Sequence, residues 1–273
     1  MLSPLPTCRK VSMNTSTSSG FAQSLLSLLL VIAFTAQAAE NEGTDEHDGS
    51  RWGLGLGISS KKKPYAGVGT DTRVIPLVSF ENRYVRLFGN QFDVKLASQG
   101  AIDFSLRTQV SIGGGYKGSD SSQLNGMADR KGTIFVGAAS TWHNDIADIS
   151  AAWLQDASGH SEGSEFKLGA QHSFRLPGRF EVTPHLEYVH FDSRYVDYYY
   201  GVRANEATTT RRAYTGKGTS EVQAGVRFGY MLTRHQRFLL DVSEARLGSG
   251  ITDSPIVNRK SLPELRFGYL YAF

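Results

Sequence analysis

Residues 261–273, at the C-terminal end of the chain, have the sequence SLPELRFGYLYAF. From Leu265 onward, every second residue is large and apolar, and the residues between are mostly charged or small. The alternating apolar set is Leu265, Phe267, Tyr269, Tyr271 and Phe273. A period of two is the pattern of a β-strand whose two faces meet different surroundings. The stretch therefore predicts a long amphipathic strand that ends on an aromatic residue.

The same period recurs over most of the chain after Trp52, for example in 102–112, 165–175 and 221–232. Helical spacing of apolar residues persists for three turns almost nowhere. Many of the predicted strands are longer than the usual five or six residues, and a tilted membrane-spanning strand needs about 9–11. Their polar positions mix Arg, Glu, Asp, Gln and Gly, as expected for a barrel interior. These patterns predict an all-β fold, a transmembrane antiparallel up-and-down β-barrel.

The composition agrees with this class. The chain has 29 Gly and 30 aromatic residues among 273. A mean hydropathy of −0.28 excludes a polytopic helical membrane protein but not a barrel, whose alternating strands average to near-neutral hydropathy. Several aromatic residues are expected near strand ends, where interfacial girdles form: Trp52, Phe80, Trp142, Trp153, Tyr188 and Tyr230.

The first residues have the features of an export signal. Arg9 and Lys10 form a positive region, 21–34 is apolar, and Ala36-Gln37-Ala38 is a small-residue cleavage site. We therefore expect a signal peptide over 1–38, a periplasmic lead-in over 39–51 and a barrel over 52–273. The only cysteine, Cys8, would be removed with the signal. The net charge of +3 would fall to +1, which gives a nucleic-acid partner no support, so we expect none.

The strand count follows from alternation and turns. We expect strands at 52–59, 70–80, 83–88, 92–98, 102–115, 131–142, 146–157, 163–175, 178–192, 218–232, 235–248 and 261–273. Splitting the segment 83–97 at Gly89-Asn90-Gln91 gives an even number, as in bacterial single-chain barrels. About twelve strands are predicted, with ten as the alternative. The long connections 116–130, 193–217 and 249–260 would lie outside the cell, and short turns would face the periplasm.

Four segments of the chain resemble one family of outer-membrane proteins. They are Pro64-Tyr65 with DTRVIPLVSFEN (71–82), LNGMADRKGT (124–133), YYYGV (198–202) and TDSPIV (252–257). In their order and spacing they resemble the MipA/OmpV family, the MltA-interacting outer-membrane proteins. The resemblance implies an outer-membrane barrel linked to the murein machinery. Some members are scaffolds that join a lytic transglycosylase to a penicillin-binding protein, and others are described as porin-like antigens, adhesins or antibiotic-response proteins.

Catalytic and metal sites have little support. His185 and Glu187 share the polar face of one predicted strand, which would allow a base oriented by a carboxylate there. No G-x-S-x-G motif occurs, and no serine can be paired with His185 from the sequence. The seven histidines have no compact ligand spacing. We therefore expect no enzyme, no metal site and no cofactor.

Two groups of residues are the candidates for other roles. Mixed charges are expected inside the barrel and would narrow or plug it: Arg107, Lys167, Arg175, Glu187, Arg227 and Arg266. The outer loops offer aromatic, cationic and polar residues that could bind lipopolysaccharide phosphates or sugars: Tyr198, Tyr199, Tyr200, Arg211, Arg212, Asp253 and Ser254. The alternatives are an outer aromatic girdle with bases at the headgroups, and, for 249–260, a fold-back into the barrel mouth.

The sequence thus predicts a structural or scaffolding barrel in the outer membrane of a Gram-negative bacterium. Its expected partners are outer-membrane lipids and lipopolysaccharide, and, through the resemblance, a lytic transglycosylase and a penicillin-binding protein. Tyr269, Tyr271 and Phe273 resemble the terminal-strand signal for the barrel-assembly machinery. The alternative is a small-solute channel, or a surface receptor or adhesin that uses the outer loops.

Overall fold

The computed structural model describes residues 49–111 and 114–273. The predicted signal peptide and most of the predicted lead-in lie outside these residues. Thirteen strand segments are present: β1 Arg51–Lys62, β2 Thr70–Glu81, β3 Val85–Phe88, β4 Gln91–Gln99, β5 Ile102–Val110, β6 Ile134–His143, β7 Asp148–Asp156, β8 Ser164–Gln171, β9 Phe174–Leu176, β10 Phe180–Phe191, β11 Thr219–Met231, β12 Gln236–Leu247 and β13 Ser261–Ala272. Two short α-helices lie in the loops, α2 Ser193–Tyr200 and α3 Ser249–Thr252.

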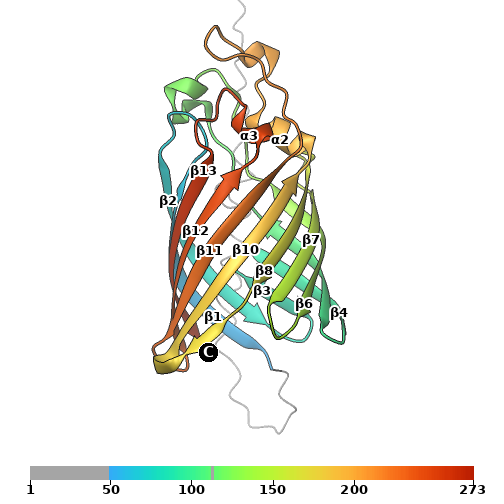
Figure 1. The fold of residues 1–273 in the computed structure, drawn as a ribbon, viewed down its shortest axis with the longest axis vertical. Coiled ribbons are helices and arrows are strands. Elements are labelled where there is room, and N and C mark those ends of the chain that lie inside the picture. Colours follow the sequence, from blue (N-terminus) through green and yellow to red (C-terminus); the bar gives the residue numbers. More distant parts are fainter. Residues whose placement is uncertain (1–48, 112–113) are drawn as a thin grey trace, which may run out of the picture. The chain divides into compact units, whose positions relative to one another are not determined.

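The strands form one closed antiparallel sheet. The last strand pairs with the first, with Leu56 opposite Tyr269. Segments β8 and β9 both pair with β10 and together make one strand that is interrupted at His172 and Ser173. The ring therefore has twelve strands, which confirms the predicted barrel and its count. Figure 1 shows the tilted strands, with α2 and α3 at one end and the C-terminus at the other.

Most predicted strand boundaries agree with the structure within three residues. The split at Gly89-Asn90-Gln91 is confirmed, because Gly89 and Asn90 form the turn between β3 and β4. The prediction for 102–115 was too long, since β5 ends at Val110 and the chain leaves the wall there. The first strand runs on to Lys62, beyond the predicted end at Ser59.

Alternation gives the wall two faces. Outward side chains are large, apolar and exposed, such as Leu56 at 62% and Trp153 at 55%, and they form an apolar belt around the barrel. Most inward positions are charged, polar or small, which is the pattern of a membrane-spanning barrel. No helix among the described residues is long and apolar enough to cross a membrane.

Gly55 is required for closure of the sheet. A Cβ atom at this position would lie 1.9 Å from the backbone oxygen of Tyr269 on β13. The first and last strands can approach this closely only because residue 55 has no side chain.

The two ends of the barrel differ. At the turn end, adjacent strands are joined by short connections, 82–84, 100–101, 144–147, 177–179 and 232–235. At the loop end the connections are mostly long, namely 63–69, 111–133, 157–163, 192–218 and 248–260. The turn between β3 and β4 is the exception, since only Gly89 and Asn90 join these two strands.

Candidate functional site

The loops at the loop end pack against one another, and we call this packed region the loop layer. It comprises the described residues of 63–69, 114–133, 192–218 and 248–260. Its apolar centre takes side chains from all four segments and from the adjoining strand ends: Tyr65, Tyr116, Leu124, Met127, Val189, Phe191, Val196, Tyr199, Tyr200, Val202, Ala245, Leu247, Ile251, Ile256 and Leu262. Burial of this set gives loops that join different parts of the wall a common core.

Three tyrosines from three loops meet in this core. The ring centroids of Tyr65 and Tyr116 are 4.6 Å apart, and those of Tyr65 and Tyr200 are 5.7 Å apart. Aromatic pairs at such distances are worth about 0.5–1.5 kcal/mol beyond their area burial. The loops after β1, β5 and β10 are therefore joined through their rings.

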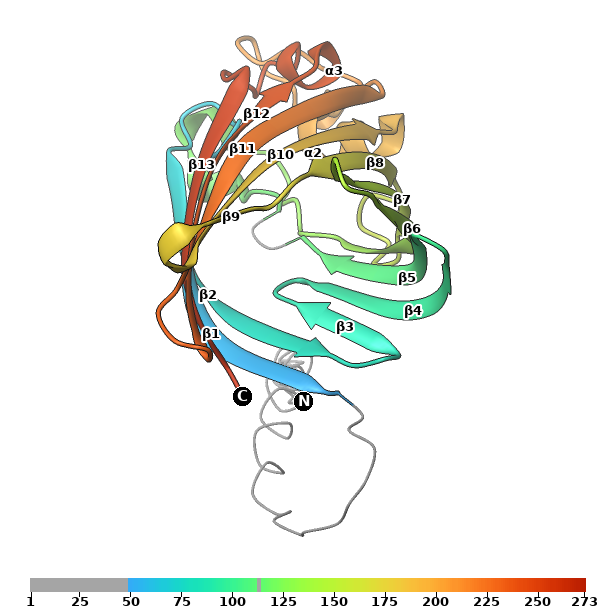
Figure 2. The same cartoon turned by 60° about the horizontal axis from the view of Figure 1, so that its bottom comes forward.

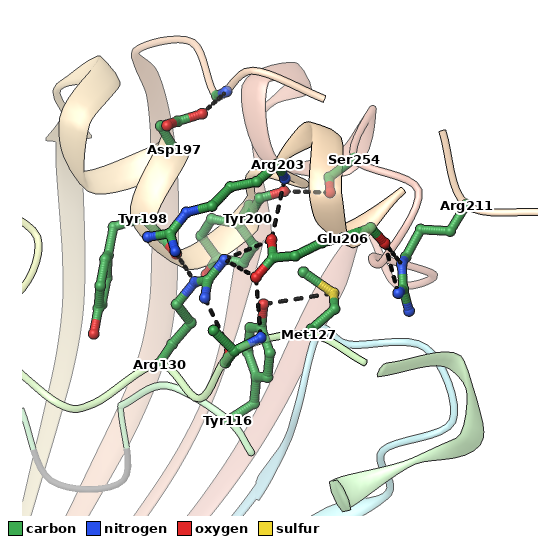
Figure 3. A network of polar contacts seen from close by, with 12 residues as sticks. Tyr116, Met127, Arg130, Asp197, Tyr198, Tyr200, Arg203, Glu206, Arg211 and Ser254 are labelled. Atoms are coloured by element: carbon green, nitrogen blue, oxygen red, sulfur yellow. Dashed lines mark hydrogen bonds and ion pairs between the residues drawn. The ribbon is translucent and has the colours of Figure 1, made fainter. Parts of the chain in front are cut away.

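Arg130 and Glu206 form a buried ion pair in the loop layer (Figure 3). Nη2 of Arg130 donates to both carboxylate oxygens, at 3.1 and 3.0 Å, and the two side chains are only 2% and 3% exposed. Arg130 also donates to the backbone oxygens of Tyr198 and Ala128, at 2.6 and 2.9 Å. The carboxylate accepts from the backbone amides of Ala128 and Arg203, at 3.0 and 3.1 Å. Both charges thus have several partners, which a buried pair needs to offset desolvation.

Arg211 is buried among backbone carbonyl groups. Its guanidinium donates to the oxygens of Glu206, Gln123 and Asn125, and the contact to Gln123 measures 2.5 Å. The bonds to Gln123 and Asn125 join the segment around residue 211 to the loop after β5, and Figure 3 shows the contacts of Arg211 with Glu206. Arg211 therefore acts as a cross-link between loops in this structure.

The ionisation of this region follows from burial and charge. Burial alone would raise the pKa of Glu206, but the amides of Ala128 and Arg203 and the Arg130 guanidinium lower it overall below the ordinary value. Burial raises the pKa of Tyr116 to about 12, with the nearby Arg130 opposing the shift. Burial also raises the pKa values of Tyr65 and Tyr200. At neutral pH the loop layer therefore holds an ionised Glu206 and neutral Tyr65, Tyr116 and Tyr200.

Local capping shapes the loop after β10. Asp192 is the N-cap of α2, and its carboxylate accepts from the backbone amide of Tyr195 at 2.9 Å. Asp197 in the same helix accepts from the amide of Gly216 at 2.7 Å. The return path of the loop is thereby fixed against the helix.

The predicted loop candidates divide into buried and accessible residues. Tyr199, Tyr200, Arg211 and Ser254 are buried in the loop layer. Ser254 Oγ donates to the backbone oxygen of Tyr200 at 2.5 Å. Tyr198 is partly buried, and its hydroxyl accepts from the amide of Lys131 at 2.9 Å. Arg212 and Asp253 are exposed, so they are the members of this group that a ligand can reach.

The segment 249–260 folds back toward the other three segments of the loop layer. Ile251 and Ile256 are fully buried in its core. Ala66 donates its amide to the Ile256 oxygen at 2.8 Å, and Tyr65 forms a bridge with Val257. Neither Arg130 nor Glu206 was predicted from the sequence to have a role of its own, although Arg130 lies in LNGMADRKGT and Glu206 is the one acidic residue in 198–217. Tyr65 was noted only as part of a segment that carries the family resemblance.

The predicted interior charges mostly form ion pairs below the loop layer. Arg107 binds Asp93 at 2.8 and 3.0 Å, Arg266 binds Glu264 at 2.6 and 2.9 Å, and Lys167 binds Glu165 at 3.0 Å. Arg227 binds Asp241 at 3.2 Å. Glu187 lies on β10, opposite Gly169 of β8 on one side and Gln223 of β11 on the other. Arg175 lies on β9, opposite Glu181 of β10 near the turn end.

His185 has a different acidic partner from the one considered from the sequence. Its Nε2 lies 3.0 Å from Asp241 on β12, whereas the sequence had suggested Glu187, two positions along its own strand. Asp241 also binds Arg227, so the three side chains form one interior cluster. Among the described residues, no group of three His, Cys, Asp or Glu side chains is arranged to hold a metal ion.

Comparisons with known proteins agree with the barrel architecture. The family described as MltA-interacting protein MipA matches residues 54–273. YiaT of Escherichia coli K12 is 25% identical over 219 residues, which cover 77% of this chain and 86% of that protein. Outer membrane protein OmpV of Vibrio cholerae is 26% identical over 174 residues, covering 63% of this chain and 64% of OmpV.

Solved barrels are much more distant. The NanC porin has 9% identity and a TM-score of 0.42, and the match covers 79% of this chain and 98% of NanC. OmpT of Vibrio cholerae, as expressed in the outer membrane, has 7% identity and a TM-score of 0.35, with coverage of 85% and 100%. This likeness is too distant to bear on function.

Proposed function

Because the chain belongs to the MipA/OmpV family of outer-membrane β-barrel proteins, we propose that it is a structural barrel that holds a murein-cleaving enzyme at its periplasmic end. The family's description as MltA-interacting supports an enzyme partner of this class. The protein is an outer-membrane barrel, so its loop end faces outward and its turn end faces the periplasm.

The observation that carries the structural role is the loop layer. Its ion pair and its apolar core connect four outer loops that leave different parts of the wall. An open porin needs a free path for solutes through its outer mouth. A layer of loops with a buried apolar core opposes such a path. This supports a barrel whose main role is not solute diffusion.

The periplasmic turns supply the contact surface in this proposal. Their side chains bond to their own backbone, which makes them ordered. Asn144 Oδ1 accepts from the amides of Ile146 and Ala147, at 2.9 and 3.1 Å. Ile146 is 84% exposed at this turn, so it presents an apolar side chain at the rim. The acidic lead-in 40–48, which lies outside the described residues, is the second expected contact.

Export and assembly belong to the same proposal. Residues 1–38 would be removed as the signal peptide. The aromatic end of β13, with Tyr269, Tyr271 and Phe273, would be bound by the barrel-assembly machinery. A penicillin-binding protein would join through the murein enzyme.

The test is a reversible cross-link in intact envelopes, followed by mild solubilisation and pull-down of the tagged barrel. A lytic transglycosylase should be recovered with the wild type, and its yield should fall with Ile146→Ser or with deletion of 40–48. Asp145→Ser, at the same turn, and removal of 207–210 in the outer loop should leave the yield unchanged. Recovery of only lipopolysaccharide and assembly factors would contradict the scaffold proposal.

A small-solute channel is the second candidate, and one observation favours it. The inward side chains of Lys61, Arg227 and Arg266 retain 39%, 40% and 50% exposure, as expected for a hydrated interior. A surface receptor would use the accessible residues Arg212 and Asp253. Removing 203–215 should abolish surface binding in that case and leave transglycosylase recovery intact.

A further inference from the structure

The wall of the barrel is incompletely paired along one edge of β2. On its β1 side, β2 pairs over its whole length, from Lys62 opposite Thr70 to Arg51 opposite Glu81. On its other side it pairs with β3 only at residues 79–81. Within the described part of the chain, residues 70–77 have no strand partner on that side. We call the edge at 74–77, beside the turn Gly89-Asn90, the lateral seam; Figure 2 shows the short β3 between β2 and β4.

The backbone groups that face the seam can be identified from one hydrogen bond. The amide of Gly89 donates to the oxygen of Val78 at 3.0 Å, so Val78 points its backbone groups toward the β3 side. Because direction alternates along a strand, Val74 and Pro76 point theirs the same way. Proline has no amide hydrogen, so the seam lacks a donor at residue 76. Proline on an unpaired edge also opposes addition of another strand.

The seam lies within the apolar belt. Val74 is outward and 68% exposed, and Pro76 lies opposite the exposed Leu56 of β1. On the far side of the turn, the exposed Phe92 and Val94 of β4 continue the belt. Unpaired backbone groups are unfavourable in hydrocarbon, so the missing donor at Pro76 makes an open edge less costly there.

The interior beside the seam is apolar, unlike the interior around the ion pairs Arg107–Asp93, Lys167–Glu165 and Arg227–Asp241. Ile75 and Leu77 of β2 alternate with the outward Val74 and Pro76, so they point inward. Phe88, at the end of β3, pairs with Ser79 on the inner face and is 46% exposed. A Cβ atom at Gly89 would meet no atom of the described residues within 4 Å, so these residues leave the space next to the turn open. An apolar strip of Ile75, Leu77 and Phe88 thus continues the outer belt into the barrel.

From this continuity we propose that the lateral seam admits one hydrocarbon chain of an outer-leaflet lipid, which lies against Ile75, Leu77 and Phe88. Neighbouring strands are about 4.8 Å apart, so a wall that lacks one strand has room for a polymethylene chain and not for a lipid headgroup. The bilayer surrounds the seam, so lipid is the apolar molecule at the highest local concentration. The headgroup would stay outside near Thr70 and Thr72, toward the outer end of β2.

Photo-cross-linking in vesicles tests this proposal. Phe88 is replaced by benzoylphenylalanine, the folded barrel is reconstituted in phosphatidylcholine vesicles, and the illuminated protein is weighed by mass spectrometry. Leu106, which is outward and exposed, receives the same replacement as a lipid-facing control. Leu239, which is inward on β12 and flanked by paired strands, is the interior control.

We expect adducts of one phospholipid mass at positions 88 and 106 and none at 239. A heat-modifiable gel shift selects folded protein in each case. An adduct at 106 without one at 88 would overturn the proposal, and so would a cross-link from 88 to a second protein chain in place of lipid.

A second pair of variants tests the apolar strip itself. Leu77→Gln should lower the adduct yield at position 88 several-fold, because it places an amide on the path of the chain. Leu239→Gln changes another inward leucine, on β12 opposite Gly229, and should leave the yield unchanged. Equal yields in both variants would contradict a chain lying along the strip.

Discussion

Arg130 and Glu206, 76 residues apart in the sequence, meet in a two-point ion pair that is almost completely excluded from solvent. Through this pair the loop after β5 is fastened to the loop after β10. A buried ion pair contributes little to the free energy of unfolding when it is compared with an apolar replacement of similar size. Removal of one partner, however, leaves an uncompensated buried charge, which costs about 3–5 kcal/mol of stability. The pair therefore acts as a latch, by which we mean that it holds these two loops of the loop layer together.

Arg130→Met should open the loop layer without unfolding the barrel. Glu206 would remain buried without its cation, so the loops should separate until the carboxylate reaches water. Limited proteolysis in detergent should cut within 114–133 or 203–215 many times faster than in the wild type. Arg212→Met, an exposed cation in the same loop, should leave the cutting rate unchanged. Equal rates for Arg130→Met and wild type would show that the pair is not a latch.

The loop layer should loosen in acid. The folded pKa of Glu206 lies below its ordinary value, so its contribution to stability is present above pH 4.5 and is lost as the pH falls through the folded pKa. Hydrogen exchange of the amides in 203–211, corrected for intrinsic rates, should rise over this range. The double variant Arg130→Met, Glu206→Leu should lack this rise, and the same rise in both proteins would assign it to another group.

Tyr116 should resist ionisation. Burial raises its pKa from 10.0 to about 12, so the neutral hydroxyl contributes stability below pH 10 that is lost as the pH rises toward 12. The ultraviolet titration of the wild type minus that of Tyr116→Phe should show one tyrosinate forming near pH 12. A midpoint near pH 10 in this difference would place Tyr116 in water.

Gly55→Ala should impair barrel closure. The added Cβ would lie 1.9 Å from the Tyr269 oxygen, so β1 or β13 must shift, and overpacking of this kind costs about 1–3 kcal/mol. We expect a lower fraction of heat-modifiable, folded barrel after refolding. Gly69→Ala is the matched control, since its Cβ would meet no atom within 4 Å. An unchanged folded fraction for Gly55→Ala would refute a role of this glycine in closure.

The wall of the barrel was predictable because each strand carries its own signal. The period of two and the turn residues Gly89 and Asn90 gave twelve strands, including the short β3. The prediction for 102–115 extended too far because Ile112 continues the apolar alternation of Val110 in the sequence, whereas the pairing of β5 ends at Val110. Strand existence is local information, whereas the point at which pairing stops depends on the neighbouring strand.

The loop layer was not predictable in the same way, because its contacts join distant residues. Arg130 and Glu206 each stand in polar stretches that look solvent-exposed. The partner of His185 was missed for the same reason: Asp241 reaches it from β12, across β11, which only the three-dimensional register places there. Tyr199, Tyr200 and Arg211 were selected for a binding role by residue type, but the structure buries them in the loop layer.

Planar-bilayer conductance of the wild type and Arg130→Met tests the central claim most directly, namely that the latched loop layer closes the outer mouth. The wild type should show no steps of porin size, and Arg130→Met should open the hydrated interior and show discrete steps. Steady porin-sized conductance in the wild type, unchanged by Arg130→Met, would contradict the claim.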